Sequence, residues 1–502
     1  MVHKHDIIII GSGLGGLTCG YILAKNGYRV TILEKNAQLG GCLQTFSRQG
    51  VKFETGMHYI GSMDKGETLY KFFNYLDLLK DVQLSRLDTT AYDIISIGDE
   101  RFPFANGAEN FVRQLSEFFP KERTNLENYY RTIADVAQKS PLYSLNFSNE
   151  QAFLVAKYIQ QSAGGFIDSV TGNKLLQSVL SGTVPLYAGE RDKTPFYIHA
   201  LINDFYNKSA FRIIGGSDAI TKSLVASIRK MGGTVITNAE VTNINCNESQ
   251  AVSVSLKNGE TLSGDYFISN VHPMRMIELV DSHLIRKAYR HRIERLDNTA
   301  GNFTVYLKFK PNTVKYCNSN VFHYESPEDV WRGGNYTSET WGRNFLYMHL
   351  CSSENQAFAD GAILMTYMNF DDVAQWQGTK IERRGADYQL FKQRKAERLL
   401  SLLERKIPDT LANIETFYTS TPLTYLDYTG TERGSMYGIL RDCTEPMQTL
   451  VSQRTKIPNL FQTGQNINSH GILGVIIGSI ITSAELLGIN TIIEQIKGNA
   501  DL

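Results

Sequence analysis

Cysteine is scarce in this sequence, and the cysteines that are present lie far apart. Among 502 residues there are six, and no two of them form a Cys-x-x-Cys pair. This spacing excludes a disulfide framework and the common zinc motifs, so no metal site is expected. Scattered free thiols are typical of a reducing compartment, and we expect a cytoplasmic protein.

Net charge and long apolar runs are also missing. Lys plus Arg number 51 and Asp plus Glu number 51, so the formal net charge is zero and nothing electrostatic favours a nucleic-acid partner. The longest apolar stretch, residues 472–483, is too short to span a bilayer, and no signal peptide is expected before the first strand. We expect a soluble protein, with at most peripheral contact on the inner face of a membrane.

The beginning of the chain has the pattern of a βαβ unit. Residues 6–10 predict a buried parallel strand, residues 14–26 a helix that ends at a glycine, and residues 28–33 a second strand. This order of strand, glycine-rich turn, helix and strand indicates an α/β fold with a parallel sheet.

A glycine motif joins the first strand to the first helix. It reads Gly11-Ser12-Gly13-Leu14-Gly15-Gly16 and contains the GxGxxG pattern. Gly13 lets a pyrophosphate approach the backbone at the helix N-terminus, where free N–H groups favour negative charge. Glu34 follows the second strand at the spacing expected of a carboxylate that accepts hydrogen bonds from ribose hydroxyls. Because a carboxylate repels a 2′-phosphate, NADP is not expected at this site.

Two more motifs follow closely. Gly40 and Gly41 permit a second close approach of the backbone to the cofactor, which NAD enzymes do not need. The adjacent Cys42 is expected to be a buried packing thiol rather than a redox group. His58 lies in a loop between two glycines, at 56–61, that can face the flavin or the substrate. A hydrogen-bonded core histidine is an equally good interpretation.

The C-terminal part reads as a strand, a glycine-rich turn and a helix. The strand ends at Gly464, and Gln465 and Asn466 are expected to contact the ribityl chain or the inner phosphate. The helix is expected to begin near Gly471, where its N-terminal amides stabilise negative charge on reduced flavin. The preceding His470 is either a proton donor or, more simply, a capping group.

Long insertions separate these motifs. Residues 76–205 are rich in helical periods and aromatic side chains, and residues 286–435 mix strands with a long helix. We therefore expect a substrate domain in these insertions and a cofactor domain in three pieces, residues 1–75, 206–285 and 436–502. A nicotinamide-binding Rossmann unit is usually continuous, so the interruption favours FAD.

The set of motifs resembles the phytoene desaturase-like flavoprotein family. The resemblance rests on GSGLGGL, LEKNAQLGGCLQTF, FETGMHYIG and the terminal TGQN and GILG segments, with weaker support from GGSDAI, VITNAEV and residues 420–438. Two positions depart from related patterns. Met57-His58 stands where bacterial-type phytoene desaturases have Gly-Pro, and Cys42 stands where amine oxidases have Arg. Both departures favour the retinol saturase branch of the family.

The resemblance implies a fold of the GR2 type, in which a discontinuous Rossmann-like FAD-binding domain carries an inserted α+β substrate domain. It implies hydride exchange between flavin N5 and a C=C or C–C bond of an apolar isoprenoid or polyene, most simply in the saturating direction. The cofactor-binding residues expected are Gly11, Ser12, Gly13, Gly15, Gly16, Glu34, Lys35, Gly40, Gly41, Cys42, Thr45, Gly56, Met57, His58, Val241, Gly464, Gln465, Gly471, Ile472 and Leu473. The candidate proton donors are His58, Tyr59 and Tyr437.

Alternatives stay open at this point. A carotenoid desaturase or a cis–trans isomerase on the same scaffold differs in the direction of the reaction, which depends on the electron donor or acceptor. The sequence does not identify that partner, because no second dinucleotide motif is visible. A prenyl-binding escort protein of the GDP dissociation inhibitor kind shares the fold without flavin chemistry. The intact set of Gly13, Glu34, Gly41 and Gly464 disfavours it.

Overall fold

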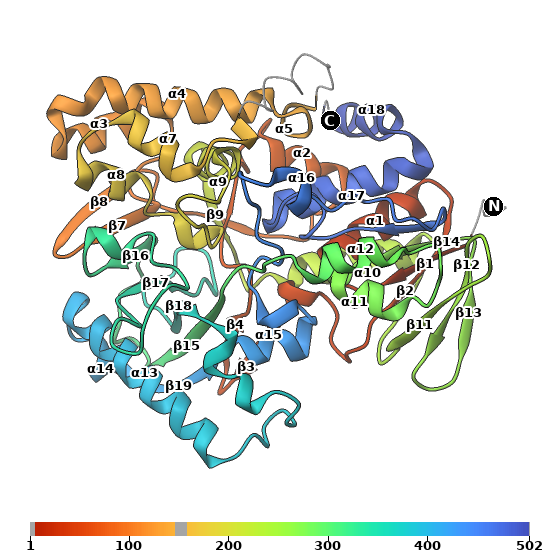
Figure 1. Cartoon of the computed structure of the whole chain (residues 1–502). Helices are drawn as coiled ribbons and strands as arrows, with labels where there is room; N and C mark the ends of the chain where they lie inside the picture. Colours follow the sequence, from red (N-terminus) through yellow and green to blue (C-terminus); the bar gives the residue numbers. More distant parts are fainter. Residues whose placement is uncertain (1–5, 146–157, 501–502) are drawn as a thin grey trace.

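The computed structural model describes residues 6–145 and 158–500, and it shows two halves built on different sheets (Figure 1). One half holds a five-stranded sheet in the order β10-β2-β1-β14-β20, with every neighbouring pair parallel. Its strands are β1 (Asp6–Ile10), β2 (Arg29–Leu33), β10 (Thr234–Ile236), β14 (Tyr266–Ser269) and β20 (Leu460–Gln462). Strands from three distant parts of the chain therefore make one doubly wound sheet.

The isoleucine run of β1 is buried on both faces of this sheet. Ile7 and Ile9 share a core with α1 (Leu14–Lys25), α10 (Asp218–Lys230) and α17 (Gly471–Leu487). Ile8 and Ile10 belong to a second core on the opposite face, with the small antiparallel sheet and α11. The elements of that second layer are β11 (Val241–Cys246), β12 (Ala251–Leu256), β13 (Thr261–Ser263) and α11 (Pro273–Leu279). Because side chains alternate along a strand, two covered faces require a continuous apolar run.

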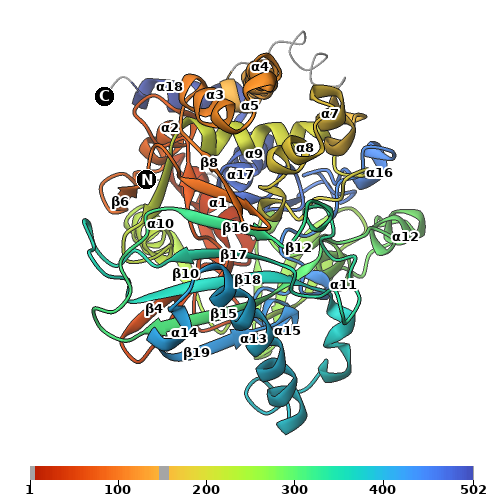
Figure 2. The ribbon, with the colours of Figure 1, turned by 90° about the vertical axis from the view of Figure 1, so that its left-hand side faces the viewer.

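The other half holds a seven-stranded sheet in the order β19-β15-β18-β17-β16-β7-β8, shown in side view in Figure 2. Its strands are β7 (Asp93–Ile97), β8 (Glu100–Phe104), β15 (Gly301–Phe309), β16 (Asn320–Tyr324), β17 (Asn344–His349), β18 (Gly361–Met368) and β19 (Ile414–Ser420). The long helix α13 (Ala386–Lys406) packs on one face. The opposite face packs against the inserted helices.

A layer of helices from the first insertion caps the molecule at the top of Figures 1 and 2. Its main members are α3 (Ala108–Phe118), α4 (Arg123–Lys139), α7 (Ala163–Val170), α8 (Lys174–Leu180) and α9 (Phe196–Lys208). The helical content of this insertion was expected, but β7 and β8 were not. β7 pairs in parallel with β16, for example Ile95 with Phe322, so that strand exists through a partner far along the chain.

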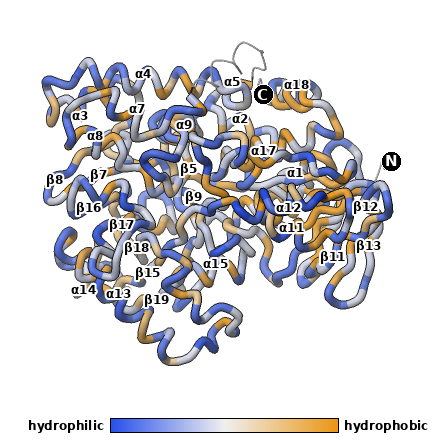
Figure 3. Tube along the Cα trace, in the orientation of Figure 1, coloured by the Kyte–Doolittle hydropathy of each residue, from blue (hydrophilic) through white to orange (hydrophobic). Residues whose placement is uncertain are grey.

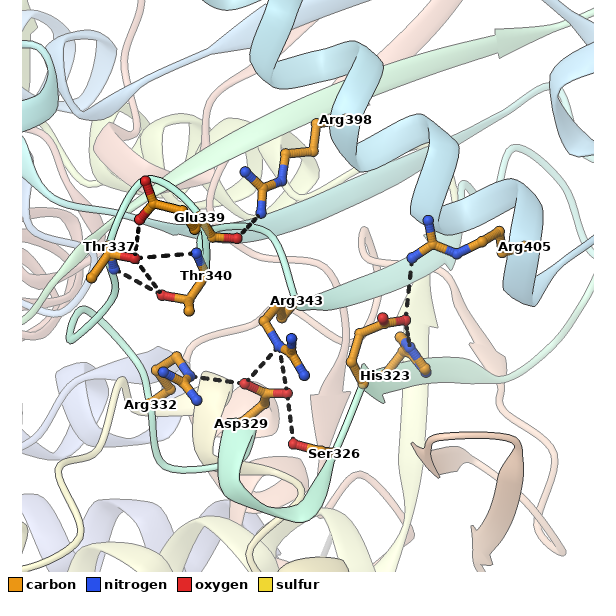
Figure 4. Close-up of polar contacts among 11 residues, drawn as sticks. His323, Ser326, Asp329, Arg332, Thr337, Glu339, Thr340, Arg343, Arg398 and Arg405 are labelled. Atoms are coloured by element: carbon orange, nitrogen blue, oxygen red, sulfur yellow. Dashed lines mark hydrogen bonds and ion pairs between the residues drawn. The ribbon is translucent and has the colours of Figure 1, made fainter.

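The loop between β16 and β17 is fixed by a buried carboxylate (Figure 4). Asp329 is fully buried and accepts hydrogen bonds from Arg332 Nε (2.8 Å), Arg343 Nε (3.0 Å) and Ser326 Oγ (2.9 Å). Arg398 of α13 donates to backbone carbonyls of the same loop. These contacts anchor the loop to the sheet and to the helix behind it.

Apolar stretches, drawn orange in Figure 3, are visible around α11 and β12, with hydrophilic stretches between them. Every helix within residues 6–145 and 158–500 is too short or too polar to cross a bilayer.

Candidate active site

A cavity of about 360 Å³ lies between the carboxyl ends of the parallel strands and the seven-stranded sheet. Segments that follow β1, β2, β14 and β20 line one side, and side chains of β15 to β18 line the other. Ligands of doubly wound folds bind outside the carboxyl ends of the strands, so this cavity is the candidate active site.

Glycine backbones form the wall at the strand ends. A Cβ atom on Gly15 would lie 2.9 Å from the Gly464 Cα, and one on Gly41 would lie 3.1 Å from the Gly13 Cα. Gly13 also pairs with Gly40 in an isolated bridge. α1 begins at Leu14, and its N-cap residue Gly13 has no side chain to cap it, so the N–H groups of the first turn that no protein side chain binds remain for a ligand. A wall of peptide groups at a helix N-terminus is the cradle that a pyrophosphate requires.

Asn270, directly after β14, holds this glycine turn in place. With its amide oxygen turned toward α1, it accepts hydrogen bonds from Gly13 N (3.3 Å) and Gly16 N (3.2 Å). Asn270 was not predicted from the sequence, because a single asparagine in the middle of the chain forms no motif. Only the parallel pairing of β14 with β1 brings it to the turn.

The Glu34 carboxylate connects the segments on the ribose side of the site through hydrogen bonds. Its Oε2 accepts from Ser12 N (3.0 Å) and Ser12 Oγ (2.6 Å), and its Oε1 accepts from Asn36 N (3.0 Å). Ser12 Oγ accepts in turn from Gly40 N (3.1 Å). Glu34 is 6% exposed and lines the cavity, so the carboxylate is pre-positioned and retains lone pairs for further donors.

The C-terminal helix begins at the same cavity. α17 starts at Gly471, whose φ of 73° suits glycine, and neither His470 nor another side chain caps its first turn. The expected capping role of His470 is therefore wrong. Its ring instead lies 4.4 Å from the ring of Tyr437, centroid to centroid. The free N–H groups of α17 thus join those of α1 around one space.

Most of the cofactor residues expected from the sequence line this cavity. They are Gly11, Gly13, Gly15, Glu34, Lys35, Gly40, Gly41, Cys42, Gly56, Met57, His58, Val241, Gly464, Gln465, Gly471 and Ile472. Ser12, Gly16, Thr45 and Leu473 lie behind the wall instead. The Ser12 hydroxyl is turned to Glu34, Gly16 packs on the backbone of Gly11, and Leu473 is buried in the core of α17. Thr45 starts the hairpin strand β3 (Thr45–Arg48).

His58 lines the cavity as a neutral imidazole. Burial, together with the nearby Arg212, lowers the pKa of His58 to about 4. The ordinary pKa of an imidazole is about 6.5, and that of His58 is lower because desolvation disfavours the charged ring. Its Nδ1 lies 3.9 Å from Glu54 Oε2, and burial raises the pKa of Glu54 to about 8. At neutral pH the acid of this pair is Glu54, which no sequence motif indicated.

The two candidate tyrosines have partners already. Tyr59 donates its hydroxyl hydrogen bond to Asp93 Oδ2 (2.9 Å), and Tyr437 donates to the carbonyl oxygen of Pro185 (3.0 Å). Burial raises the pKa of both tyrosines above the ordinary value. Both line the cavity, yet their protons are held by these acceptors.

The wall opposite the glycines is aromatic and aliphatic. The side chains that the sheet contributes to this wall include Tyr324, Leu346, Met365 and Tyr367. Asn302 lies beside them, and its amide donates a hydrogen bond to Tyr425 Oη (3.4 Å). These residues lie far apart in the sequence. Their sequence signal is limited to the alternation of side chains along β15 and β18. Alternation predicts that a strand has two faces, but it does not show which face turns toward the cofactor-binding residues.

The sheet topology and the glycine cradle together define a dinucleotide-binding protein of the doubly wound type. The chain belongs to the family described as flavin containing amine oxidoreductase, whose model matches residues 14–486. The predicted FAD cofactor, oxidoreductase activity and Rossmann-like fold are thereby confirmed.

Individual relatives are similar along nearly the whole chain. All-trans-retinol 13,14-reductase of Rattus norvegicus is 27% identical, with 96% of this chain and 86% of that protein covered. Phytoene desaturase (lycopene-forming) of Paracoccus sp. is 23% identical, with 96% of each covered. An oxidoreductase structure from Methanosarcina mazei superposes with a TM-score of 0.65 at 15% identity, covering 95% of this chain and 99% of the other. That structural likeness supports the fold.

The residues present fit FAD. The cradle at Gly15 and Gly464 leaves no room for a Cβ atom, the N-termini of α1 and α17 are uncapped, and a buried carboxylate stands at the end of β2. These are the groups that a pyrophosphate and a ribose need.

Proposed function

We propose that this FAD-dependent oxidoreductase adds or removes hydrogen at a C=C or C–C bond of an apolar isoprenoid or polyene. One observation carries the proposal. The charged carboxylates, lysine and arginine that line the cavity, Glu34, Lys35, Glu240 and Arg275, all belong to the nucleotide side. Among the described residues, the wall from β15 to β18 contributes tyrosines, aliphatic side chains and neutral amides, and no carboxylate that would hold an ammonium group.

An apolar, conjugated substrate suits such a wall. Tyrosine faces and methionine bind extended π systems without charge, and the large rings exclude water. The names of the similar proteins point the same way, since one refers to retinol and the other to phytoene. An amine substrate, which the family description suggests, lacks a counter-charge in this wall.

We propose distinct roles for the residues around the cofactor. The phosphates and the ribityl chain bind at the glycines of α1 and at residues 464–465. Glu34 binds the adenosine ribose. The N-terminus of α17 stabilises negative charge on the flavin ring. When bound, FAD supplies two-electron redox chemistry at a carbon–carbon bond. His58 is the side chain that presents a proton to the substrate, since the hydroxyl groups of Tyr59 and Tyr437 are engaged.

The direction of the reaction is tested with the protein itself. Chemically reduced, FAD-loaded protein is mixed anaerobically with a panel of polyenes, and the products are analysed by mass spectrometry. Saturation, the direction we propose, adds two hydrogens; a desaturase removes them from the oxidised protein, and an isomerase leaves the mass unchanged. If no polyene reacts or changes and the purified protein holds no flavin, the escort-protein alternative replaces the proposal.

We also propose a cytoplasmic location with peripheral membrane contact through α12 (Lys287–Glu294) and α16 (Pro446–Thr449). The two helices lie side by side in Figures 1 and 2, and Arg292 Nη1 donates to the carbonyl oxygens of Gln448 (2.8 Å) and Leu450 (3.0 Å). Met447 is 78% exposed and Leu450 is 49% exposed. Lys287 and its basic neighbours add positive charge suited to anionic headgroups.

Vesicle co-sedimentation tests this surface. We expect binding to phosphatidylcholine vesicles that contain phosphatidylserine, weaker binding to phosphatidylcholine alone, and a loss of binding in Met447→Asp. Leu390→Asp is the matched control, because Leu390 is 50% exposed on the distant helix α13. Equal sedimentation of both variants and the wild type would contradict this contact.

A further inference from the structure

We propose that Glu54 stores the proton that His58 delivers to the substrate, and that the Lys52–Asp218 ion pair connects Glu54 to solvent. This inference rests on the proposed function, because it requires a reaction that protonates a carbon in the cavity. Glu54 is not among the residues that line the cavity, so it acts through His58 as a positioning residue.

Glu54 and His58 face each other across the bend that follows β4. The strand β4 (Val51–Glu54) ends at Glu54, and His58 follows four residues later. The side chains of Glu54 and His58 are 11% and 10% exposed, and Glu54 Oε2 lies 3.9 Å from His58 Nδ1. Neither ring nitrogen of His58 has a hydrogen-bond partner among the described residues. A shift of about 1 Å makes the carboxyl–imidazole hydrogen bond and leaves Nε2 for the substrate.

Charged groups on two neighbouring elements and on its own strand act on Glu54. Arg212 of β9 (Ala210–Ile213) is buried and favours the ionised carboxylate most, and Lys52 of β4 favours it less. Asp218 of α10 opposes ionisation. Arg212 also faces Asp93, a second buried carboxyl whose pKa is raised to about 7. The charge of one guanidinium therefore acts on two buried carboxyls and favours the ionised form of each.

The resting position of the proton follows from burial. Burial raises the pKa of Glu54 to about 8, whereas burial and Arg212 lower the pKa of His58 to about 4. At pH 7 the Glu54 carboxyl is protonated and the imidazole is neutral. In the transfer, the Glu54 O–H bond breaks as an N–H bond forms at Nδ1, and the Nε2–H bond breaks as a C–H bond forms on the substrate. Glu54 is left as a carboxylate near Arg212, and reduced FAD is the two-electron reductant that completes the saturation.

An ion pair at the surface offers the return path for the proton. Lys52 Nζ lies 2.5 Å from Asp218 Oδ1, and the Lys52 side chain is 34% exposed. Lys222 Nζ, on the exposed side, lies 2.7 Å from Asp218 Oδ2. Both Lys52 and Asp218 act electrostatically on Glu54. In this proposal the proton returns to Glu54 from the β4–α10 side, where Lys52 is partly exposed, and not through the substrate cavity.

Infrared spectroscopy of the FAD-bound protein tests the stored proton without any substrate. We expect a protonated-carboxyl C=O band at pH 7 that titrates near pH 8 and is lost in Glu54→Gln. Asp93→Asn separates the contribution of the other buried carboxyl, and Glu67→Gln is the matched control away from the cavity. FAD content is measured in each variant to confirm folding. An unchanged band in Glu54→Gln overturns the proposal, whether or not a polyene substrate has been found.

Kinetics test the delivery, using the polyene of the panel that reacts fastest with the wild type. In Glu54→Gln we expect a rate at least about a hundredfold lower at pH 7 with little change in KM, and partial recovery in Glu54→Asp. The wild-type rate falls as pH rises through about 8, and this limb is absent in Glu54→Gln. Lys52→Met slows later turnovers and spares the first. A Glu54→Gln protein with the wild-type rate and pH profile overturns the proposal. If the wild-type protein reacts with no polyene of the panel, the proposed function itself is contradicted.

Discussion

Ser12 and Glu34 lie 22 residues apart and meet through two hydrogen bonds, from Ser12 N (3.0 Å) and Ser12 Oγ (2.6 Å) to the same carboxylate oxygen. The first glycine turn and the end of β2 are therefore one rigid unit. This unit positions the carboxylate for the ribose before any cofactor arrives.

Glu34→Ala should weaken FAD binding. The substitution removes charge-assisted hydrogen bonds worth about 1.5–3 kcal/mol, which corresponds to a loss in affinity of about 10- to 150-fold. Fluorescence titration of the apoprotein with FAD measures the effect. Glu260→Ala, in the exposed turn between β12 and β13, is the control. Wild-type affinity in Glu34→Ala would show that the ribose lies elsewhere.

The two helical glycines of α17 should respond oppositely to alanine. A Cβ atom on Gly474 would lie 2.7 Å from Ser469 Cβ and 2.8 Å from the Ser469 backbone, so Gly474→Ala displaces the loop that enters the site. We expect the free energy of unfolding to fall by about 1–3 kcal/mol, with loss of bound FAD. Gly478 has 3.7 Å to its nearest neighbour, and Gly478→Ala should be neutral or stabilising by up to about 1 kcal/mol.

Denaturant unfolding and flavin absorbance of the two proteins give the comparison. Equal stability and equal flavin content in both variants would contradict the close approach of the 469 loop to α17.

Replacing His58 and replacing Tyr59 should have different consequences. His58→Phe keeps FAD and lowers the rate of polyene reduction by about 10²–10⁴-fold, because it removes the side chain that presents the proton. Tyr59→Phe leaves Asp93 without one of its donors and should cost about 1–3 kcal/mol of stability while turnover changes little. Parallel measurement of unfolding and single-turnover rates separates the two. A slow, stable Tyr59→Phe protein would transfer the proton-donor role to Tyr59.

Stability should fall steeply in mild acid. Burial lowers the pKa of His58, His272, His323 and His470 to about 4 and that of His199 and His349 to about 3. Between pH 6.5 and these values the unfolded chain binds protons that the folded protein excludes, so stability rises with pH in this window and is lost as pH falls through it. The raised pKa values of Glu54 and Asp93 act in the opposite sense, since the stability they add at low pH is lost as pH rises toward 8 and 7.

Urea unfolding at pH 5 and pH 7 measures this slope. His349→Gln should flatten it, because an amide can replace both hydrogen bonds of the ring without binding a proton. A slope that is the same in wild type and variant would contradict the buried, neutral state of His349.

The amino-acid sequence by itself determined the cofactor half of this protein. β1, α1, β2 and the start of α17 depend on contiguous patterns: an isoleucine run, a glycine motif and a carboxylate at fixed spacing. In these segments the residues that the backbone needs are also the residues that the cofactor needs. Only glycine, for example, permits the close approach of Gly15 to Gly464.

Only the tertiary structure decided how the other half completes the site. Asn270 reaches the glycine turn through the pairing of β14 with β1, and β7 joins the second sheet through β16. Burial raises the pKa of Glu54 and outweighs the opposing charge of Arg212, which lies on a strand more than a hundred residues away. Pairing partners and desolvation are properties of the folded chain, and no local pattern encodes them. Packing in the folded protein therefore decides that Glu54 carries the proton. The cofactor site, in contrast, could be predicted from the glycine motifs and the spacing of Glu34 along the chain.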